Sequence, residues 1–488
     1  MTYANSAPAG AQNHGRLKFC SWRAATLAPL LVFAVGGCDS LLEVNLPGAV
    51  QASDLIDPLL AETLAISVQG DFECGLVDHL WWPGLWFDEF LNSSTSRPNA
   101  LMELRAQLVD VYADPCNSGT GPTWTILQLP RIQGENIRGI LDGFDAEALA
   151  KVDDPDWIKA RAFFYEAYSI QILSEAFCAM TLNGGPMMTS AAAFAEAESR
   201  FGSAMTHAGL VKAGNQGDAD NLVIASLVGR ARSRLHQGNA SGTVADASMV
   251  PLDFEFVATY SNSPSRRRNK INDRNNRGSS IQPHREFLDL TISSAGELTQ
   301  NRQVAGTTDI DDPRVAIDYD PGRGYGGRGY IEYRTQQKYL SRDSSIPFAS
   351  GREALLMIAE VDPAQTLAII NTLRSDPTGL YSGIDESAWP LPAYAGGSAA
   401  DIAATLREER RRELWMQTHQ PGDKLRWLGM ARPSGLQTVS EKLAGTSPVT
   451  AFEPISEYGS PRGAFTCHSI PFLERTSNQN LSNADTGR

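Results

Sequence analysis

Aromatic residues are concentrated in three stretches of the chain where they could bind a ligand by stacking. One stretch, 79–90, contains three tryptophans, a second lies in a glycine-rich loop, and a third lies in a loop rich in proline and glycine. Indole and phenol rings pack against the apolar faces of sugar rings, and their N–H and O–H groups orient the ligand. The candidate ligand-binding residues are therefore Trp81, Trp82, Trp86, Tyr325, Tyr330, Trp389 and Tyr394. Core packing is the stronger alternative for the tryptophan cluster, because aromatic side chains are more often buried than used in a site.

Motifs that would carry out catalysis or hold a cofactor are missing from the sequence. It contains no H-E-x-x-H, no P-loop and no G-x-S-x-G. Residues 322–327 fit G-x-G-x-x-G, but no apolar strand precedes them and no helix clearly follows, as a dinucleotide site requires. The histidines lack metal-ligand spacing, and pairs such as Asp88 and Glu89 are expected by chance among 56 acidic residues. We expect no metal, no cofactor and no enzymatic activity, although catalytic residues brought together from distant positions stay an alternative.

The N-terminus has the pattern of a secretion signal. Three basic residues, the last of them Arg23, precede an apolar segment at 27–34, which is the order found in signal peptides. Small residues then lead to Cys38, an ending typical of bacterial lipoproteins, in which acyl chains on the thiol supply membrane affinity. We expect residues 1–37 to be a lipoprotein signal peptide and Cys38 to be the lipidated first residue. The alternatives are an ordinary signal peptide or a buried N-terminal helix with a chance cysteine.

Export would place the remaining cysteines in an oxidising compartment. After removal of the signal and acylation of Cys38, four thiols remain, on Cys74, Cys116, Cys178 and Cys467. Four thiols allow two disulfides with three possible connectivities. Loop context favours Cys74 with Cys116, and four buried free thiols are the alternative.

The charge of the chain excludes one class of partner. The formal net charge is −14, and residues 1–37 contain only basic charges, so the remaining body is more acidic still. Such a body repels phosphates, and we expect no nucleic-acid partner. The basic run at 266–268 has no interleaved aromatic residues and is expected to be a solvated loop. The longest apolar run, 24–37, is too short to cross a bilayer as a helix.

Helical periodicity dominates the rest of the chain. Phe164, Ala167, Tyr168 and Ile172 follow the spacing of one helix face, and short polar turns separate further alanine-rich helices. This pattern favours a mostly α fold with tetratricopeptide-like helix pairs at about 157–250 and 353–420. Earlier helices are expected at 54–70 and 99–113. The region at about 251–350 is expected to be irregular and rich in loops, apart from a short strand near 253–256.

Several stretches of the chain resemble one family in order and spacing. The tether at 38–48 reads CDSLLEVNLPG, the segment 347–360 ends in Ala-Glu, and 369–374 contains Asn-x-x-Arg. The segment 406–414, LREERRREL, matches the pattern l-x-x-E-R-x-x-E-L, although the Glu-Gly-x-Arg that usually follows is absent. Two further stretches, residues 162–165 and the turn at 184–187, match the same family. Together they resemble the SusD/RagB family of outer-membrane nutrient-binding lipoproteins.

The resemblance implies a single SusD-like domain over residues 38–488. It implies a protein that is lipid-anchored in the outer membrane, surface-exposed, and seated on a SusC-type TonB-dependent barrel. Such a protein would bind a nutrient, an oligosaccharide or a peptide, and deliver it to the barrel without chemistry. Charged residues three and four apart at Glu409, Arg410 and Glu413 are expected to brace the helix and neighbouring loops rather than to form a site.

Two alternatives belong to other functional classes. A surface-anchored glycan hydrolase would show clustered carboxylates in a cleft and would turn over an oligosaccharide. A purely structural helical scaffold would have neither a ligand nor a barrel partner. The order of the motifs favours the binding lipoprotein.

Overall fold

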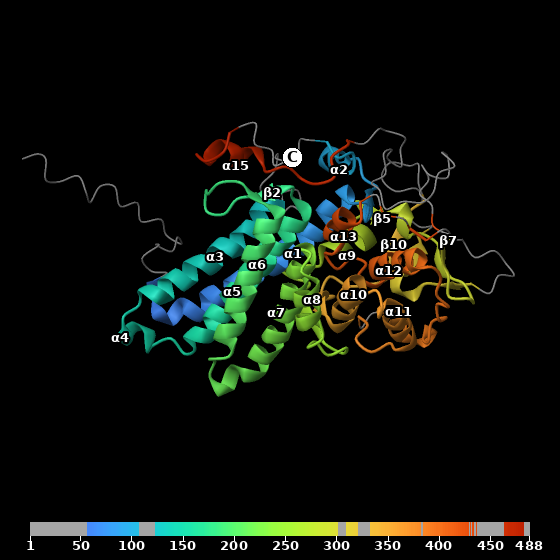
Figure 1. Ribbon diagram of the computed structural model, residues 1–488. Coiled ribbons are helices and arrows are strands. Elements are labelled where there is room, and N and C mark those ends of the chain that lie inside the picture. The colour runs from blue at the N-terminus through green and yellow to red at the C-terminus, as the bar shows by residue number, and fades with distance from the viewer. Residues whose placement is uncertain are drawn as a thin grey trace, which may run out of the picture. The chain divides into compact units, whose positions relative to one another are not determined.

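The computed structural model describes residues 56–106, 123–300, 309–320, 332–381, 384–428, 430, 432–433, 436 and 463–482. All of these belong to the unit Ile56–Arg488. Helices make up most of its regular structure, as expected, and the sheets are small (Figure 1). The predicted signal peptide, Cys38, Cys116, Tyr325 and Tyr330 lie outside the described residues, and their predicted roles stay predictions.

Five long helices form the first half of the unit and pack in chain order. They are α1 Ala61–Trp86, α3 Thr123–Gly143, α5 Pro155–Ala176, α6 Ser190–Ala208 and α7 Gln216–His236. Each contacts the next in this series, and Figure 1 shows them side by side. Shorter helices accompany them, namely α2 Arg97–Glu103, α4 Ala146–Leu149 and α8 Ala240–Ala247. This packing of consecutive helices is the tetratricopeptide-like arrangement predicted for about 157–250, and in the structure it begins earlier, with α1 and α3.

Small residues allow α6 and α7 to approach closely. The buried face of α6 consists of Ala193, Phe194, Ala197, Phe201, Ala204 and Ala208. Gly229 of α7 lies under the ring of Phe201, where a Cβ atom would be 2.3 Å from Cζ of that ring. A larger residue than glycine would therefore force the two helices apart. The helix α6 is capped by the side chain of Thr189, which accepts from the N–H of Ala192.

A second group of helices follows the variable region. It consists of α10 Gly351–Val361, α11 Thr366–Ser375, α12 Ala399–Glu413 and α13 Gln420–Arg426, with α15 Phe472–Ser477 near the C-terminal end. Ser398 and Asp401 form a reciprocal capping box at the start of α12, which fixes where this helix begins. These helices confirm the prediction of renewed helical structure at about 353–420.

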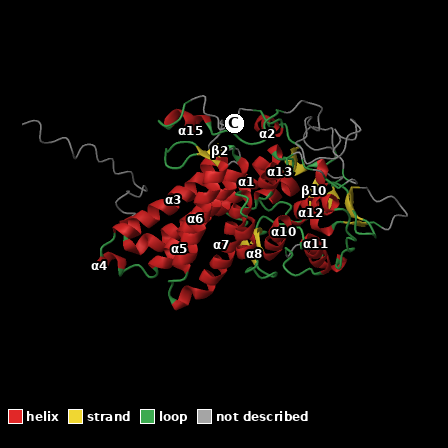
Figure 2. Cartoon of the chain, viewed as in Figure 1, coloured by secondary structure: helices red, strands yellow, loops and turns green. Residues whose placement is uncertain are grey.

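The strands are short, antiparallel and scattered through the loops (Figure 2). The paired segments are β1 Phe90–Asn92 with β5 Ile281–Pro283, β2 Ala179–Met180 with β3 Met188–Thr189, β4 Glu255–Ala258 with β11 Ile346–Ser350, β6 Leu290–Ile292 with β7 Leu298–Gln300 and β8 Ile310–Asp311, and β9 Ile317–Tyr319 with β10 Arg334–Gln336. The strand predicted near 253–256 is thus β4, two residues later. The described part of 251–350 is irregular apart from these pairs and a few short turns such as α9 Lys270–Asn272.

The first long helix differs from the prediction. The expected helix at 54–70 and the tryptophan-rich stretch after it form one helix, α1, which begins at Ala61 and ends at Trp86. Its second half is buried on every side, so it lacks the polar stripe that marks an amphipathic helix. Pro83 lies in the last turn of α1, although proline in a helix interior usually breaks or kinks the helix. Within the described residues, which reach 106 in this part of the chain, the helix predicted at 99–113 corresponds to α2, Arg97–Glu103.

The basic run at 266–268 is ion-paired rather than free in solvent. Arg266 binds Asp71, Arg267 lies 3.2 Å from Glu73, and Arg268 lies 3.9 Å from Asp273. Two of these carboxylates belong to α1, so the basic run fastens the variable region to the first helix. Arg266 is nevertheless exposed, so the expectation of a solvated loop is correct only in part: the run lies at the surface but is paired with carboxylates.

A disulfide joins Cys178, just after α5, to Cys467, which lies 289 residues further along the chain. Backbone hydrogen bonds reinforce the connection, because the N–H of Cys178 donates to the carbonyl of His468 and the N–H of His468 donates to Ala176, each at 2.9 Å. Cys74 is also disulfide-bonded. The alternative of four free thiols is therefore wrong. No helix among the described residues is both long and apolar enough to span a bilayer.

Candidate functional site

The tryptophan cluster belongs to the core. Trp81, Trp82 and Trp86 are 1%, 5% and 0% exposed, and the indole N–H of Trp81 donates to Asp78 at 2.9 Å. Their rings have no face available to a ligand, because the surrounding core side chains cover them. The stacking role predicted for these three residues is corrected in favour of the alternative, core packing.

The two candidates after α11 also pack against the protein. Tyr394 is buried, and the guanidinium of Arg374 lies 5.9 Å from the centre of its ring. Trp389 is half-buried, and its indole N–H points to the carbonyl of Leu373 at 3.4 Å. These contacts hold the loop against α11. Trp389 keeps some exposed surface, whereas Tyr394 offers almost none.

A pocket of about 890 Å³ lies between α1, α5, α7 and β4. None of the five aromatic candidates that the structure describes lines it. Its wall includes four aromatic residues, Trp157 and Tyr165 of α5, Phe254 just before β4 and Phe256 of β4. Their rings are held by neighbours: the guanidinium of Arg161 lies 5.0 Å from the centre of the Trp157 ring, and Phe256 lies 5.2 Å from Phe164. Fixed aromatic surface next to a polar rim is typical of a binding pocket.

Two donors at this pocket, both on largely buried side chains, have no partner within the described part of the chain. Tyr165 is 5% exposed as a residue, and its hydroxyl group makes no hydrogen bond to a described residue. Burial, together with the carboxylate of Glu73, raises the pKa of this phenol, so it stays protonated. Arg161 donates through one terminal nitrogen to Glu62 at 2.6 Å, but its buried Nε has no acceptor. A buried donor without an acceptor is costly, and a ligand oxygen would relieve that cost.

The rim of the pocket is polar and acidic. Asp218 and Asn221 of α7 and Asp253 before β4 are exposed, and Asn215 donates to Asp154 at 2.8 Å. Glu255 is half-buried, and burial raises its pKa to about 7, although the charge of Lys338 acts in the opposite direction. The pocket thus combines apolar rings, two donors and several acceptors, a set suited to binding a polar ligand that also has an apolar face.

Two smaller pockets have different surroundings. One of about 500 Å³ is lined by Asp289, Asp311 and Asp318 together with the largely buried Arg314 and Lys338. Another of about 490 Å³ is mainly aliphatic and lies between α10, α11, α12 and α13. Neither has an exposed aromatic wall, and within the described ranges no group of His, Cys, Asp and Glu side chains is arranged to hold a metal ion.

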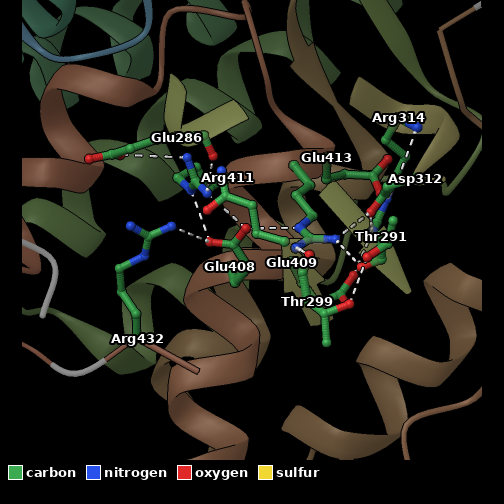
Figure 3. A network of polar contacts seen from close by, with 12 residues as sticks. Glu286, Thr291, Thr299, Asp312, Arg314, Glu408, Glu409, Arg411, Glu413 and Arg432 are labelled. Atoms are coloured by element: carbon green, nitrogen blue, oxygen red, sulfur yellow. Dashed lines mark hydrogen bonds and ion pairs between the residues drawn. The ribbon is translucent and has the colours of Figure 1, made fainter. Parts of the chain in front are cut away.

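The charged residues of α12 form a buried ionic network rather than a site (Figure 3). Glu409 binds Arg314 and Arg374, and Glu413 binds Arg352 at 2.6 Å. Arg410 lies 3.0 Å from Asp423 of α13. The structural role expected for these residues is confirmed. Their partners, however, lie in distant segments, so the motif connects α12 to the variable region and to α11.

Sequence reasoning missed the pocket because its residues come from four elements that span 62–257. Each one had an ordinary local interpretation. Trp157 lies one heptad before Phe164, so its spacing alone is that of a residue on the buried face of α5. The alternation of carboxylates and aromatic rings at 253–256 predicted a strand, and it was also the one local signal for the pocket.

Comparisons with solved structures identify the fold. No protein-family model and no curated protein matches the sequence. A SusD-like protein from Bacteroides fragilis NCTC 9343 aligns with a TM-score of 0.60 and 12% identity, over 89% of this chain and 98% of its own. A SusD-like carbohydrate-binding protein from the same strain gives a TM-score of 0.56 and 14% identity, over 86% and 98%. A chitin-binding SusD homologue from Flavobacterium johnsoniae gives 0.54 and 10%, over 86% and 95%. The chain therefore has the fold of the SusD-like proteins, as the resemblance of its motifs predicted.

Proposed function

We propose that this protein is a glycan-binding lipoprotein of the SusD/RagB type. Its fold supports the proposal, since two of the solved structures with this fold are described as a carbohydrate-binding and a chitin-binding protein. The observation that favours a glycan is the pocket between α1, α5, α7 and β4. It offers aromatic faces for sugar rings and two donors for their oxygens. The ligand is bound and released without chemical change.

Binding is tested with the full chain in mild detergent by calorimetry against a panel of oligosaccharides. Trp157→Ala removes the indole from the pocket wall and should weaken binding about 5- to 20-fold, because an aromatic contact contributes about 1–2 kcal/mol. Trp389→Ala is the matched control, since this half-buried tryptophan lies outside the pocket. A larger effect of Trp389→Ala would move the site to the loop after α11. Release of shorter products from the panel would favour a hydrolase.

We further propose that Cys38 is acylated and anchors the protein in the outer membrane, exposed at the cell surface. There it delivers its ligand to a SusC-type TonB-dependent barrel. The order of charged, apolar and small residues before Cys38 supports the anchor, and the SusD-like fold supports the partner. Mild-detergent purification of the tagged protein should bring down a barrel protein in equal amount. Purification without a barrel, from cells in which Cys38 is acylated, would contradict the delivery role.

A further inference from the structure

The charges around the pocket between α1, α5, α7 and β4 are unbalanced. Its lining includes four carboxylates, Glu62, Asp218, Asp253 and Glu255, and the single guanidinium of Arg161. Glu62 is bound to Arg161 at 2.6 Å, so these two charges cancel. The other three carboxyl groups have no ion pair and no side-chain hydrogen bond with the described residues. Those of Asp218 and Asp253 are exposed and charged, whereas burial raises the pKa of Glu255 to about 7, so this group is only partly ionised near neutral pH. The pocket therefore presents an excess of negative charge to whatever enters it.

Cations near the pocket do not restore the balance. Lys212 lies next to the rim but pairs with Asp153 at 3.1 Å. Lys338 acts on Glu255 through space, yet it is buried and donates to the carbonyl of Trp415 at 2.8 Å. A ligand with carboxylate or sulfate groups would thus meet like charges without a cation to bind it. A ligand with ammonium groups would meet free carboxylates.

The carboxylates are accompanied by features that point to a sugar. Tyr165 is 5% exposed as a residue and lines the pocket, and its unpartnered hydroxyl can donate to an acceptor such as a hydroxyl or ring oxygen. The rings of Trp157 and Phe256 provide apolar surface on the same pocket. A simple cation would satisfy the carboxylates but neither this donor nor the rings.

We infer that this pocket selects oligosaccharides with free amino groups, such as glucosamine oligomers, and rejects acidic glycans. The inference rests on the proposed glycan-binding function and specifies its ligand class. Ammonium groups would pair with the exposed carboxylates of Asp218 and Asp253, Glu255 would share a hydrogen bond with an amino or hydroxyl group, and a sugar oxygen would accept from the hydroxyl of Tyr165. Exposed ion pairs of this kind are individually weak, so the preference over the N-acetylated oligomer is expected to be about tenfold at low salt. It should shrink as salt rises, because the charges are screened.

The test compares three hexasaccharides by calorimetry on the full chain at about pH 6.5: glucosamine, N-acetylglucosamine and galacturonate. The triple variant Asp218→Asn, Asp253→Asn, Glu255→Gln should lose the preference for the amino oligomer and keep its affinity for the N-acetylated one. A matched triple variant, Asp142→Asn, Glu147→Gln, Asp220→Asn, removes three exposed carboxylates outside the pocket and should keep the preference.

Each outcome decides the inference. Loss of the preference in the first variant alone supports it. Equal affinity for the amino and N-acetylated oligomers, or tighter binding of the galacturonate, overturns it and leaves the glycan-binding function intact. Binding of oligolysine in place of every sugar overturns both, as does the absence of any oligosaccharide binding. The experiment thereby distinguishes an error in the inferred ligand class from an error in the proposed glycan-binding function.

Discussion

Buried charge on α12 is stabilising only because each charged group has a partner. Glu409 is 1% exposed and accepts from the Nε of Arg374 at 2.9 Å, and it also binds Arg314. Burial alone would raise the pKa of this carboxyl, but the two guanidinium groups hold it below its ordinary value. Glu409 is thus ionised at neutral pH.

Glu409→Gln should be strongly destabilising. It leaves the buried guanidinium groups of Arg314 and Arg374 without their shared carboxylate, and breaking a buried pair costs about 3–5 kcal/mol. Glu147→Gln is the control, because its pair with Lys151 is exposed and contributes at most about 0.5 kcal/mol. Urea unfolding of both variants measures the difference. Equal midpoints would show that the network adds no net stability.

Glu89 makes the stability of the fold depend on pH. Burial raises its pKa to about 7, although the backbone N–H of Met416 donates to it at 2.6 Å and Lys338 and Arg411 lie near. Because the pKa in the folded state lies above the ordinary value of 4.5, the folded protein binds a proton that the unfolded chain has lost. The stabilising effect is complete below pH 4.5 and is lost as the pH rises through about 7.

Glu89→Gln should remove this dependence, since glutamine stays neutral and its oxygen can still accept from Met416. The variant should therefore gain stability relative to the wild type as the pH rises from about 5 to 8, by on the order of 3 kcal/mol. Urea titrations at several pH values in this range provide the measurement. A constant difference between the two proteins would mean that Glu89 is ionised throughout.

At the scale of elements, the start of α5 connects helix stability to the pocket. Asp154 caps α5 by accepting from the N–H of Trp157 at 3.1 Å. It also accepts from the N–H of Lys212 and the amide of Asn215, both at 2.8 Å. The same carboxylate thus holds the first turn of α5, which carries Trp157, and the turn before α7, which carries Asn215 to the pocket rim.

Asp154→Ala should weaken both stability and ligand binding. Loss of the cap costs about 1–2 kcal/mol, and the turn before α7 loses two hydrogen bonds. Burial acts to raise the pKa of Asp154, but the hydrogen bonds outweigh it and lower the pKa, so the contribution is present above 3.8 and lost at lower pH. Asp154→Asn keeps an acceptor and should lose less. Unchanged ligand affinity in Asp154→Ala would contradict the link to the pocket.

Prediction from the sequence succeeded for elements whose position depends only on nearby residues, such as amphipathic helices bounded by polar turns. The period of Phe164 and Ala167, together with polar turns, located α5 and its neighbours. It failed for the second half of α1, because a helix buried on all sides has no period and Pro83 resembles a stop. The sequence also gave no indication that α12 is buried, since charged residues usually lie at the surface. Only ion pairs with residues far along the chain offset the cost of burying its charges. The pocket could not be predicted, because no local pattern brings α1, α5, α7 and β4 together.

At the scale of the whole molecule, the disulfide between Cys178 and Cys467 closes a loop of nearly three hundred residues. Replacing both cysteines by serine should lower the free energy of unfolding by about 2–5 kcal/mol, because the unfolded chain regains the freedom that the loop removes. Urea unfolding with and without reductant measures this. Limited proteolysis should cut the variant first within 463–482, which the bond holds against α5. Identical unfolding of the two proteins under oxidising conditions would contradict a stabilising role.

The sequence separation of these two cysteines also determines when their disulfide can form during biosynthesis. A ribosome adds about 5–20 residues per second, so the 289 residues between them take roughly 15 to 60 s. Throughout that interval the thiol of Cys178 has no correct partner in the chain already made. An oxidant that acts on the nascent chain could therefore pair it only with an earlier cysteine that is still reduced. Correct pairing therefore depends on the rate of chain elongation relative to the rate of thiol oxidation. It is favoured when the chain stays reduced until the segment with Cys467 has been synthesised.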